Sequence, residues 1–260
     1  MIGEAEFDRI KTSAGTCKYS SLDYAEFDDC RNADVIIDDG HLVILCDRGK
    51  SPSFLYFAAD DFYNVIEQIK KISEPLRINF VPHEHAQKLC DIGFETWGEY
   101  NDYFNKELKT APIGSCSYGD IEFLHPNDCP AASLMSKKCE GQSRGFGGET
   151  AEWFAEWITE NDTIIVRENG EIAGFCCVTI YSEGTTLWIR EIAVDPKCQG
   201  RGYGKRLIEQ AICYGVHKGA VKGFLAVDTM NENAIHIYEK YGFKAKGDEG
   251  ELQMVRRCIY

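Results

Sequence analysis

The stretch of sequence that most constrains the fold is residues 194–205 (VDPKCQGRGYGK), where a β-rich run ends, glycines follow and a helical pattern begins. Glycine lets backbone N–H groups turn toward an anion, and the N-terminus of the following helix adds a partial positive charge. Arg201, Lys205 and Arg206 raise the local potential further. This order of strand, glycine-rich turn and helix predicts a phosphate or pyrophosphate site within an α/β fold.

Two common nucleotide patterns do not fit this stretch. A P-loop needs glycine at position 199 and Ser or Thr at position 206, where the chain has Gln199 and Arg206. A dinucleotide fingerprint, G-x-G-x-x-G, fails at its third glycine from either possible start. The pattern that does fit is Q-x-x-G-x-G, carried by Gln199, Gly202 and Gly204.

A second motif follows at residues 231–243, which read N-x-x-A-x-x-x-Y-E-K-Y-G-F. Asn231, Ala234 and Tyr238 have helical spacing, and Gly242 suits a helix C-terminus because glycine tolerates positive φ. The two motifs, in this order, resemble the pyrophosphate loop and the following signature of the GNAT superfamily (GCN5-related N-acetyltransferases). The resemblance covers residues 119–260.

The resemblance implies a mixed α/β (α+β) sheet flanked by helices, with acetyl-CoA as acyl donor. It implies that backbone amides of the loop hold the CoA pyrophosphate, and that Ile192 and Val194 pair with the pantetheine arm. An N–H near Ala193 or Val194 would polarise the thioester carbonyl, and Asn231 would contact the cofactor arm. The cofactor-binding residues expected from the resemblance are Ile192, Ala193, Val194, Gln199, Gly200, Arg201, Gly202, Tyr203, Gly204, Lys205 and Asn231.

The resemblance also implies catalytic roles. Tyr238 would lie near the sulfur and protonate the departing thiolate. The acceptor must lose a proton, because an alkylammonium of pKa about 10 is almost wholly protonated at neutral pH. Glu191 matches the position of a base in some family members, and Asp228 is the second candidate. Core packing is the alternative explanation for Tyr238, and an ion pair with Arg190 or Lys197 is the alternative for Glu191.

The length of 260 residues predicts two domains, divided as 1–115 and 116–260. Each half contains a hairpin signal, Asp39-Gly40 in the first and Asn169-Gly170 in the second. The first half lacks a glycine-rich loop between its strand and its helix. We interpret it as a degenerate GNAT-like copy that does not bind CoA, which makes the chain a tandem of two such domains. Chance similarity between two α/β segments is the alternative.

Hydrophobic periodicity and turn residues predict the individual elements. In the second half we expect helices toward Cys139 and at 151–158, 204–217 and 231–241, and strands at 120–124, 163–167, 172–181, 187–194, 224–227, 243–246 and 252–259. In the first half we expect helices at 61–72 and 83–90, and strands at 35–37, 42–46, 54–57 and 76–81.

Composition narrows the partners. The formal net charge of -14 repels phosphate backbones, so nucleic acid is not expected as a substrate. An acidic surface suits a cationic small molecule or a basic peptide, with solubility as the alternative explanation. No apolar run reaches the roughly 18 residues of a membrane span, and no export signal is visible. We expect a cytoplasmic monomer or homodimer that does not engage a membrane.

The cysteines and histidines suggest no metal centre. The 12 cysteines contain no C-x-x-C pair, so reduced thiols are expected. His83-Glu84-His85 places its histidines on different sides of a helix, so we expect no metal site there.

The sequence therefore predicts an N-acetyltransferase that moves an acetyl group from acetyl-CoA to a primary amine of a small molecule or peptide. Direct attack in a ternary complex needs no covalent enzyme intermediate. A non-catalytic acyl-CoA binding or sensing module and an interaction protein without cofactor are the alternatives. The acceptor pocket is expected near residues 141–157, where Trp153 and Trp157 either line it or pack a helix on the sheet.

Overall fold

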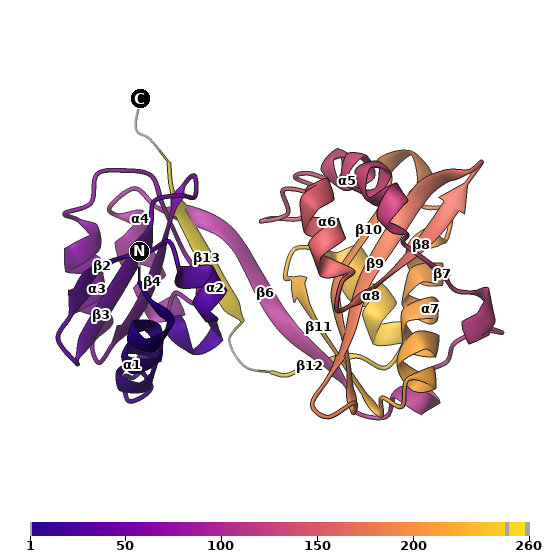
Figure 1. Ribbon diagram of the computed structural model, residues 1–260, viewed down its shortest axis with the longest axis horizontal. Helices are drawn as coiled ribbons and strands as arrows, with labels where there is room; N and C mark the ends of the chain where they lie inside the picture. Colours follow the sequence, from indigo (N-terminus) through magenta and orange to yellow (C-terminus); the bar gives the residue numbers. More distant parts are fainter. Residues whose placement is uncertain (1, 248–249, 258–260) are drawn as a thin grey trace. The chain divides into compact units, whose positions relative to one another are not determined.

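The computed structural model describes residues 2–247 and 250–257 of the 260-residue chain. The chain forms two compact units (Figure 1). Unit 1 comprises Met1–Glu99 and Glu249–Tyr260, and unit 2 comprises Tyr100–Asp248. Each unit has a mixed α/β architecture, a sheet with helices on both of its faces. In the part of the chain that the structure describes, no helix is long and apolar enough to cross a membrane.

The division between the units differs from the predicted one at residue 115. It falls inside strand β6 (Glu95–Asn105), whose second part pairs with β11 of unit 2. Strand β13 (Glu251–Arg256) pairs antiparallel with β5 of unit 1 (Leu76–Ile78), so the C-terminal strand belongs to the first unit. The physical reason is that tertiary packing, not local sequence, sets a strand's partner. The predicted strand 252–259 ends at residues 258–259, which lie outside the described residues.

The sheet of unit 2 has the strand order β6–β11–β10–β9–β8–β7, with β12 also paired to β6. Its neighbours are antiparallel except for β10 and β11, which are parallel. The bounds of its strands, besides β6, are β7 Glu122–Phe123, β8 Asp162–Glu168, β9 Glu171–Tyr181, β10 Thr186–Val194, β11 Lys222–Asp228 and β12 Lys244–Ala245.

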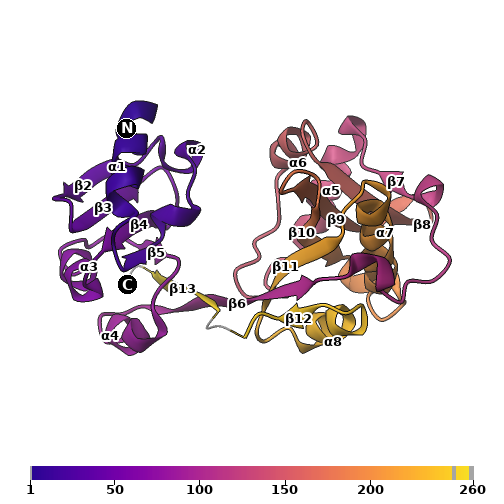
Figure 2. The same cartoon turned by 90° about the horizontal axis from the view of Figure 1, so that it is seen from below.

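Four helices cover this sheet, and each pair contributes to a separate hydrophobic cluster (Figure 2). One face packs against α5 (Cys129–Lys138) and α6 (Ala151–Trp157), and the other against α7 (Tyr203–His217) and α8 (Glu232–Lys240). Alternate residues of each strand supply the two clusters, as strand geometry requires. The short 3₁₀ turns of unit 2 are η3 Leu108–Thr110, η4 Tyr118–Asp120, η5 Pro126–Asp128 and η6 Pro196–Cys198.

The sheet opens between β10 and β11. Their parallel register ends at Trp188↔Phe224. Just beyond it, the pairing of β10 with β9 contains a bulge between Ile189 and Glu191. A bulge bends a strand and increases its twist, so β10 leaves β11 and continues to Val194 paired with β9 alone. The carboxyl-terminal parts of β10 and β11 therefore separate beside the residues predicted to bind the cofactor.

The predicted hairpin of unit 2 is confirmed, and two side chains cap the predicted helices. The β8–β9 hairpin turns at Asn169 (φ 51°) and Gly170 (φ 83°), the positive φ pair that a type I′ turn requires. The Thr150 hydroxyl caps α6 by accepting a hydrogen bond from the Trp153 N–H (3.1 Å). The side chain of Asn231 caps α8.

Unit 1 has the strand order β2–β3–β4–β5–β13, with β1 also paired to β4. Helices α1 and α2 lie over one hydrophobic cluster, and α3 and α4 lie over the other. The bounds of its elements are α1 Glu4–Ala14, β1 Tyr19–Ser20, η1 Leu22–Tyr24, α2 Phe27–Cys30, β2 Asp34–Asp38, β3 Leu42–Asp47, β4 Ser53–Ala59, α3 Phe62–Ile69, η2 His83–His85 and α4 Ala86–Cys90.

Both units contain the same succession of elements. In unit 1 it is β2-β3-β4-α3-β5-α4, and in unit 2 it is β8-β9-β10-α7-β11-α8. The strand pairings are antiparallel, antiparallel and parallel in each. The turns before α3 and α7 differ. In unit 1 only Asp60 and Asp61 separate β4 from α3, and the Asp61 carboxylate accepts a hydrogen bond from the Tyr63 N–H (2.9 Å).

Candidate active site

The loop between β10 and α7 has open backbone N–H groups at a helix N-terminus. Gly200 (φ 71°) and Gly202 (φ 86°) both occupy the left-handed region, which glycine adopts without steric strain. Gly202 is the N-cap of α7, and no side chain caps that helix. Among the described residues, a Cβ on either glycine would have no atom within 4 Å. The N-terminus of the 15-residue helix therefore faces open space, a geometry that fits a phosphate group.

Side chains hold this loop in place at both ends. The buried carboxylate of Asp195 accepts hydrogen bonds from the Lys197 N–H (2.9 Å) and from the Lys138 ammonium (2.8 Å). The Lys138 ammonium is the main cause that lowers the pKa of Asp195. The Gln199 amide donates to the Val194 carbonyl (3.1 Å). The side chain of Gln199 thus supports the loop from within.

The charge of Arg201 is neutralised by a carboxylate partner and is not directed into the loop. Its guanidinium pairs with Glu168 of β8, with one N–H···O distance of 2.6 Å. The Tyr203 hydroxyl donates to the same carboxylate (3.1 Å). The Lys205 Nζ atom lies 3.9 Å from Oε1 of Glu209, one helical turn along α7. In this arrangement backbone N–H groups and the helix terminus supply the attraction for an anion, and Arg201 contributes only if it leaves Glu168.

The edge of β10 away from β9 presents the N–H groups of two residues, while the Val194 carbonyl on that edge accepts from Gln199. The Asp195 N–H donates to the Ala173 carbonyl on β9 (2.9 Å). Because hydrogen-bonded and non-hydrogen-bonded pairs alternate along antiparallel strands, Ala193 also faces β9. Ile192 and Val194 then direct their N–H groups to the opposite edge, where β11 has separated. Of the two N–H groups predicted to polarise a thioester, the geometry favours Val194 over Ala193.

Tyr238 of α8 lies on the α7/α8 face of the sheet, in the hydrophobic cluster against which Ile192 and Val194 pack. Its side chain is buried, and burial raises the pKa of its hydroxyl. The hydroxyl therefore keeps its proton at neutral pH, which suits a proton donor. The same packing also serves the core, so both interpretations of Tyr238 are compatible with its position.

Glu191 lies directly after the bulge of β10 and faces α5 and α6. Its atom Oε2 is buried and has no hydrogen-bond partner among the described residues. Burial, together with the nearby Glu149 carboxylate, raises the pKa of Glu191 to about 8, although Arg190 opposes the shift. A carboxylate with a pKa near the working pH can accept a proton and release it again. This is the perturbation expected of a general base.

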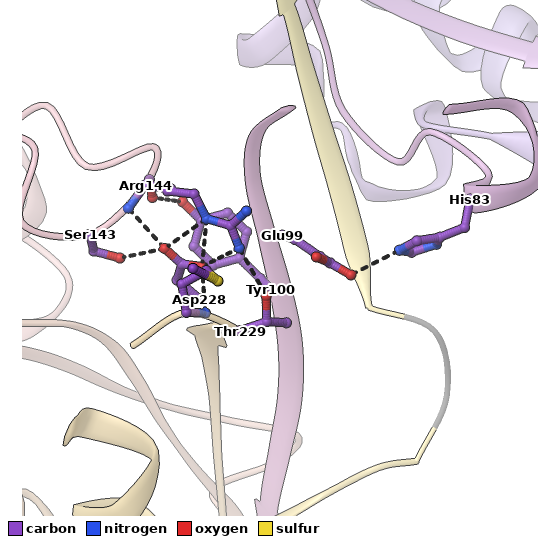
Figure 3. A network of polar contacts seen from close by, with 8 residues as sticks. His83, Glu99, Tyr100, Ser143, Arg144, Asp228 and Thr229 are labelled. Atoms are coloured by element: carbon purple, nitrogen blue, oxygen red, sulfur yellow. Dashed lines mark hydrogen bonds and ion pairs between the residues drawn. The ribbon is translucent and has the colours of Figure 1, made fainter. Parts of the chain in front are cut away.

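Asp228, the second predicted base, is fully engaged at the end of β11 (Figure 3). Its Oδ1 accepts from Arg144 Nη2 (2.7 Å) and Nε (3.0 Å), and its Oδ2 accepts from the Arg144 backbone N–H (2.8 Å). Ser143 Oγ and the Met230 N–H also donate to it. Burial opposes ionisation, but the hydrogen bonds from Arg144 prevail and lower the pKa of Asp228. A carboxylate so occupied is poorly suited to take a proton from an acceptor.

The glycine-rich segment 141–148 joins these parts of the site. Arg144 ties it to β11 through Asp228, and the Arg144 carbonyl accepts a hydrogen bond from the Tyr100 hydroxyl on β6 (Figure 3). Gln142 of the segment accepts a hydrogen bond from Gln199 of the β10–α7 loop. Sequence reasoning missed Arg144 and Tyr100. The available signal was the single arginine within a glycine-rich segment.

Asn231 uses its side-chain carbonyl to cap α8, accepting from the Ala234 N–H (3.2 Å). Its backbone N–H donates to the Asp228 carbonyl (2.8 Å). The side-chain NH₂ of Asn231 is the part suited to contact a cofactor. Within residues 2–247 and 250–257, no cluster of three or more His, Cys, Asp or Glu residues is arranged to hold a metal ion.

Comparison with known proteins points to one family. A model of the Acetyltransferase (GNAT) family matches residues 132–243, within unit 2. The chain is 33% identical over 116 residues to an uncharacterized N-acetyltransferase of Methanocaldococcus jannaschii, covering 41% of this chain and 51% of that protein. It is 41% identical over 152 residues to the spermidine N(1)-acetyltransferase of Escherichia coli, covering 54% of this chain and 81% of that protein. The chain spans about half or less of the length of the first curated relatives that it matches.

A solved structure resembles almost the whole chain. The GCN5-related N-acetyltransferase from Sphaerobacter thermophilus superposes with a TM-score of 0.64 at 14% identity. The match covers 96% of this chain and 90% of that one. At this identity the likeness concerns the fold alone, which is the predicted mixed α/β sheet flanked by helices.

Proposed function

Since the chain belongs to the acetyltransferase (GNAT) family, we propose that it is an N-acetyltransferase that transfers the acetyl group of acetyl-CoA to a primary amine in a ternary complex. The observation that carries the proposal is the pairing of an open phosphate cradle at α7 with the buried, unpartnered carboxylate oxygen of Glu191. Both lie on β10 or at its end, beside the place where β10 leaves β11.

The residues of the loop fit the pyrophosphate of CoA. Gly200 to Gly204 offer backbone N–H groups and a helix N-terminus, with open space where a Cβ would project from Gly200 and Gly202. The N–H groups of Ile192 and Val194, on the edge of β10 away from β9, are available to pair with the pantetheine amides. When bound, acetyl-CoA supplies an acetyl group already activated as a thioester. The Val194 N–H would stabilise negative charge on the carbonyl oxygen.

Glu191 acts as the general base in this proposal. It takes one proton from the acceptor ammonium, so that the neutral nitrogen can form the new C–N bond while the C–S bond breaks. The pKa of about 8 keeps a useful fraction of Glu191 ionised at neutral pH. Tyr238 donates its hydroxyl proton to the departing sulfur, and burial keeps that proton in place until then. The second proton, which the nitrogen loses as the amide forms, restores the Tyr238 hydroxyl.

Asp228 is a positioning residue in this proposal. Its hydrogen bonds to Arg144 and Ser143 hold segment 141–148 at the end of β11. That segment also contacts Gln199 of the cofactor loop, so one buried carboxylate orders two sides of the site. Asp228 therefore supports acceptor binding without touching the transferred group.

We further propose that unit 1 is a degenerate copy of unit 2 that does not bind CoA. The shared succession of strands and helices supports this idea. The turn before α3 contains no glycine cradle, and the Asp61 carboxylate already occupies the N-terminus of that helix. An anionic cap in this position repels phosphate. Calorimetry with CoA should give one site per chain, and two equivalent sites would contradict the assignment.

The acceptor and the transfer are tested together by mass spectrometry. The protein is incubated with acetyl-CoA and a panel of small amines and peptides, and acetylated products are sought. We expect a mass increase on at least one primary amine. Tight CoA binding without transfer to any amine would favour an acyl-CoA sensing module, and the absence of CoA binding would overturn both functions.

The free thiols of the described cysteines fit the reducing cytoplasm, where we place the protein.

A further inference from the structure

Arg190, the bulge residue of β10, is held over a group of tryptophan rings. Its guanidinium lies 4.8 Å from the Trp153 ring centroid, 5.0 Å from that of Trp157 and 5.9 Å from that of Trp188. Trp153 and Trp157 stack on each other with an interplanar angle of 6°. Cation–π contacts of this kind hold the guanidinium against the rings without using its N–H donors as a carboxylate would.

The N–H groups of Arg190 have no partner in the described part of the chain. No hydrogen bond and no ion pair within residues 2–247 and 250–257 involves its guanidinium, and its side chain is exposed. The situation differs from that of Arg144, Arg167 and Arg201, which all pair with carboxylates. The chain has 42 acidic residues against 28 lysines and arginines, yet within the described residues Arg190, like Arg206, has no carboxylate partner.

The bulge turns Arg190 and Glu191 toward the same face of the sheet. In a regular strand two consecutive side chains point to opposite faces. Here Arg190 contacts the tryptophans of α6, and Glu191 interacts with Glu149, the residue just before the cap of α6. The surface beside α6 therefore carries a carboxylate pair and an unpaired guanidinium next to each other.

This pattern of charge complements a zwitterion. A substrate ammonium is attracted to Glu149 and to the ionised form of Glu191. A substrate carboxylate would be repelled by them unless a cation held it, and Arg190 offers the planar fork that binds carboxylates with two parallel hydrogen bonds. Because Arg190 and Glu191 are consecutive, the two substrate groups must be separated by only a few bonds.

We propose that the acceptor is a small amino acid or amino-acid-like molecule, a primary amine that carries a carboxylate, and that Arg190 binds that carboxylate. This inference rests on the proposed acetyltransferase function and narrows its substrate class. Arg190 sets specificity, while Glu191 handles the proton. The acidic net charge of the chain, which by itself favours a cationic acceptor, does not describe the surface beside α6.

The test compares matched acceptors in the wild type and in Arg190→Lys. The panel contains α- and ω-amino acids and their carboxamides, each assayed for kcat/KM with acetyl-CoA. Lysine keeps the positive charge beside Glu191 and loses the bidentate fork. We expect Arg190→Lys to lower kcat/KM about 10- to 100-fold for amino acids, the range for charge-assisted hydrogen bonds, and to change the carboxamides only slightly. Arg31→Lys, on the surface of unit 1, is the matched control.

Two results would overturn the assignment. One is a wild type that prefers carboxamides or neutral amines to amino acids. The other is an equal loss for both kinds of acceptor in Arg190→Lys, which would mean that the arginine only locks α6 onto β10.

A binding measurement separates this inference from the proposed function. Amino acids and their N-acetyl derivatives are titrated into the CoA-bound protein while tryptophan fluorescence is followed, because three tryptophans surround Arg190. Carboxylate-dependent binding that is lost in Arg190→Lys supports the inference even if no amine is acetylated, a result that would sink the proposed function alone. Acetylation of amines without any carboxylate-dependent binding would overturn the inference alone.

Discussion

The pKa of Glu191 makes a prediction about stability that requires no substrate. Its ordinary value is 4.5 and its value in the folded protein is about 8. Because the folded pKa is the higher one, the folded state binds the proton more tightly between these values, and stability falls as the pH rises through this window. At 1.36 kcal/mol per pKa unit the full effect is about 5 kcal/mol. Local relaxation and water penetration reduce the penalty of a buried charge, so we expect about 2–4 kcal/mol.

Glu191→Gln removes the titration while it keeps the shape of the side chain. Urea unfolding followed by tryptophan fluorescence reports mainly on unit 2, which contains Trp153, Trp157 and Trp188. We expect the variant to match the wild type at about pH 4, below both pKa values, and to exceed its free energy of unfolding by about 2–4 kcal/mol at pH 9. Glu149→Gln is the control. It removes a neighbouring carboxylate that raises the pKa of Glu191, so the pH at which stability falls should be lower than in the wild type. A difference between Glu191→Gln and wild type that does not change with pH would refute the reasoning.

Three further substitutions test the site. Asp228→Asn breaks a buried ion pair and should lower the free energy of unfolding by about 3 kcal/mol, together with kcat/KM for the acceptor; a stability equal to wild type would contradict the anchoring by Arg144. Gly148→Ala should lower the free energy of unfolding by about 2 kcal/mol or more, which urea denaturation measures. The reason is that φ at Gly148 is +75° and the new Cβ would lie 2.8 Å from a backbone atom of α5. Glu168→Gln releases Arg201 and should tighten CoA binding a few-fold by calorimetry; weaker binding would mean that the carboxylate shapes the loop.

The predictable parts of the fold are those whose residues are close in sequence. The hairpin at Asn169-Gly170 and the cap at Thr150 were predictable because each depends on one or two backbone conformations that few residues tolerate. The glycine loop was predictable for the same reason. Gly200 and Gly202 adopt the positive φ that the pattern indicates.

The unpredicted parts depend on partners that are far apart in sequence. Strand β6 pairs with β11, and β13 pairs with β5 near the start of the chain, so no local pattern announces the division inside β6. Asp228 was a reasonable base by position alone. Its occupation by Arg144, 84 residues earlier, required the folded chain to bring a glycine-rich segment to the end of a strand. The bulge that turns Arg190 toward the face of Glu191 is likewise invisible in the sequence.

The pH dependence of acetyl transfer tests the central claim most directly. We expect kcat/KM of the wild type for a primary amine to rise through about pH 8, where Glu191 ionises, and to level off above it, because the base then supplies neutral amine. Glu191→Gln should bind CoA as the wild type does and lose about 10²- to 10⁴-fold in kcat/KM. Its kcat/KM should rise steadily with pH up to the amine pKa, because without the base only amine that is already neutral can react. An unchanged rate and an unchanged pH profile in Glu191→Gln would contradict the account.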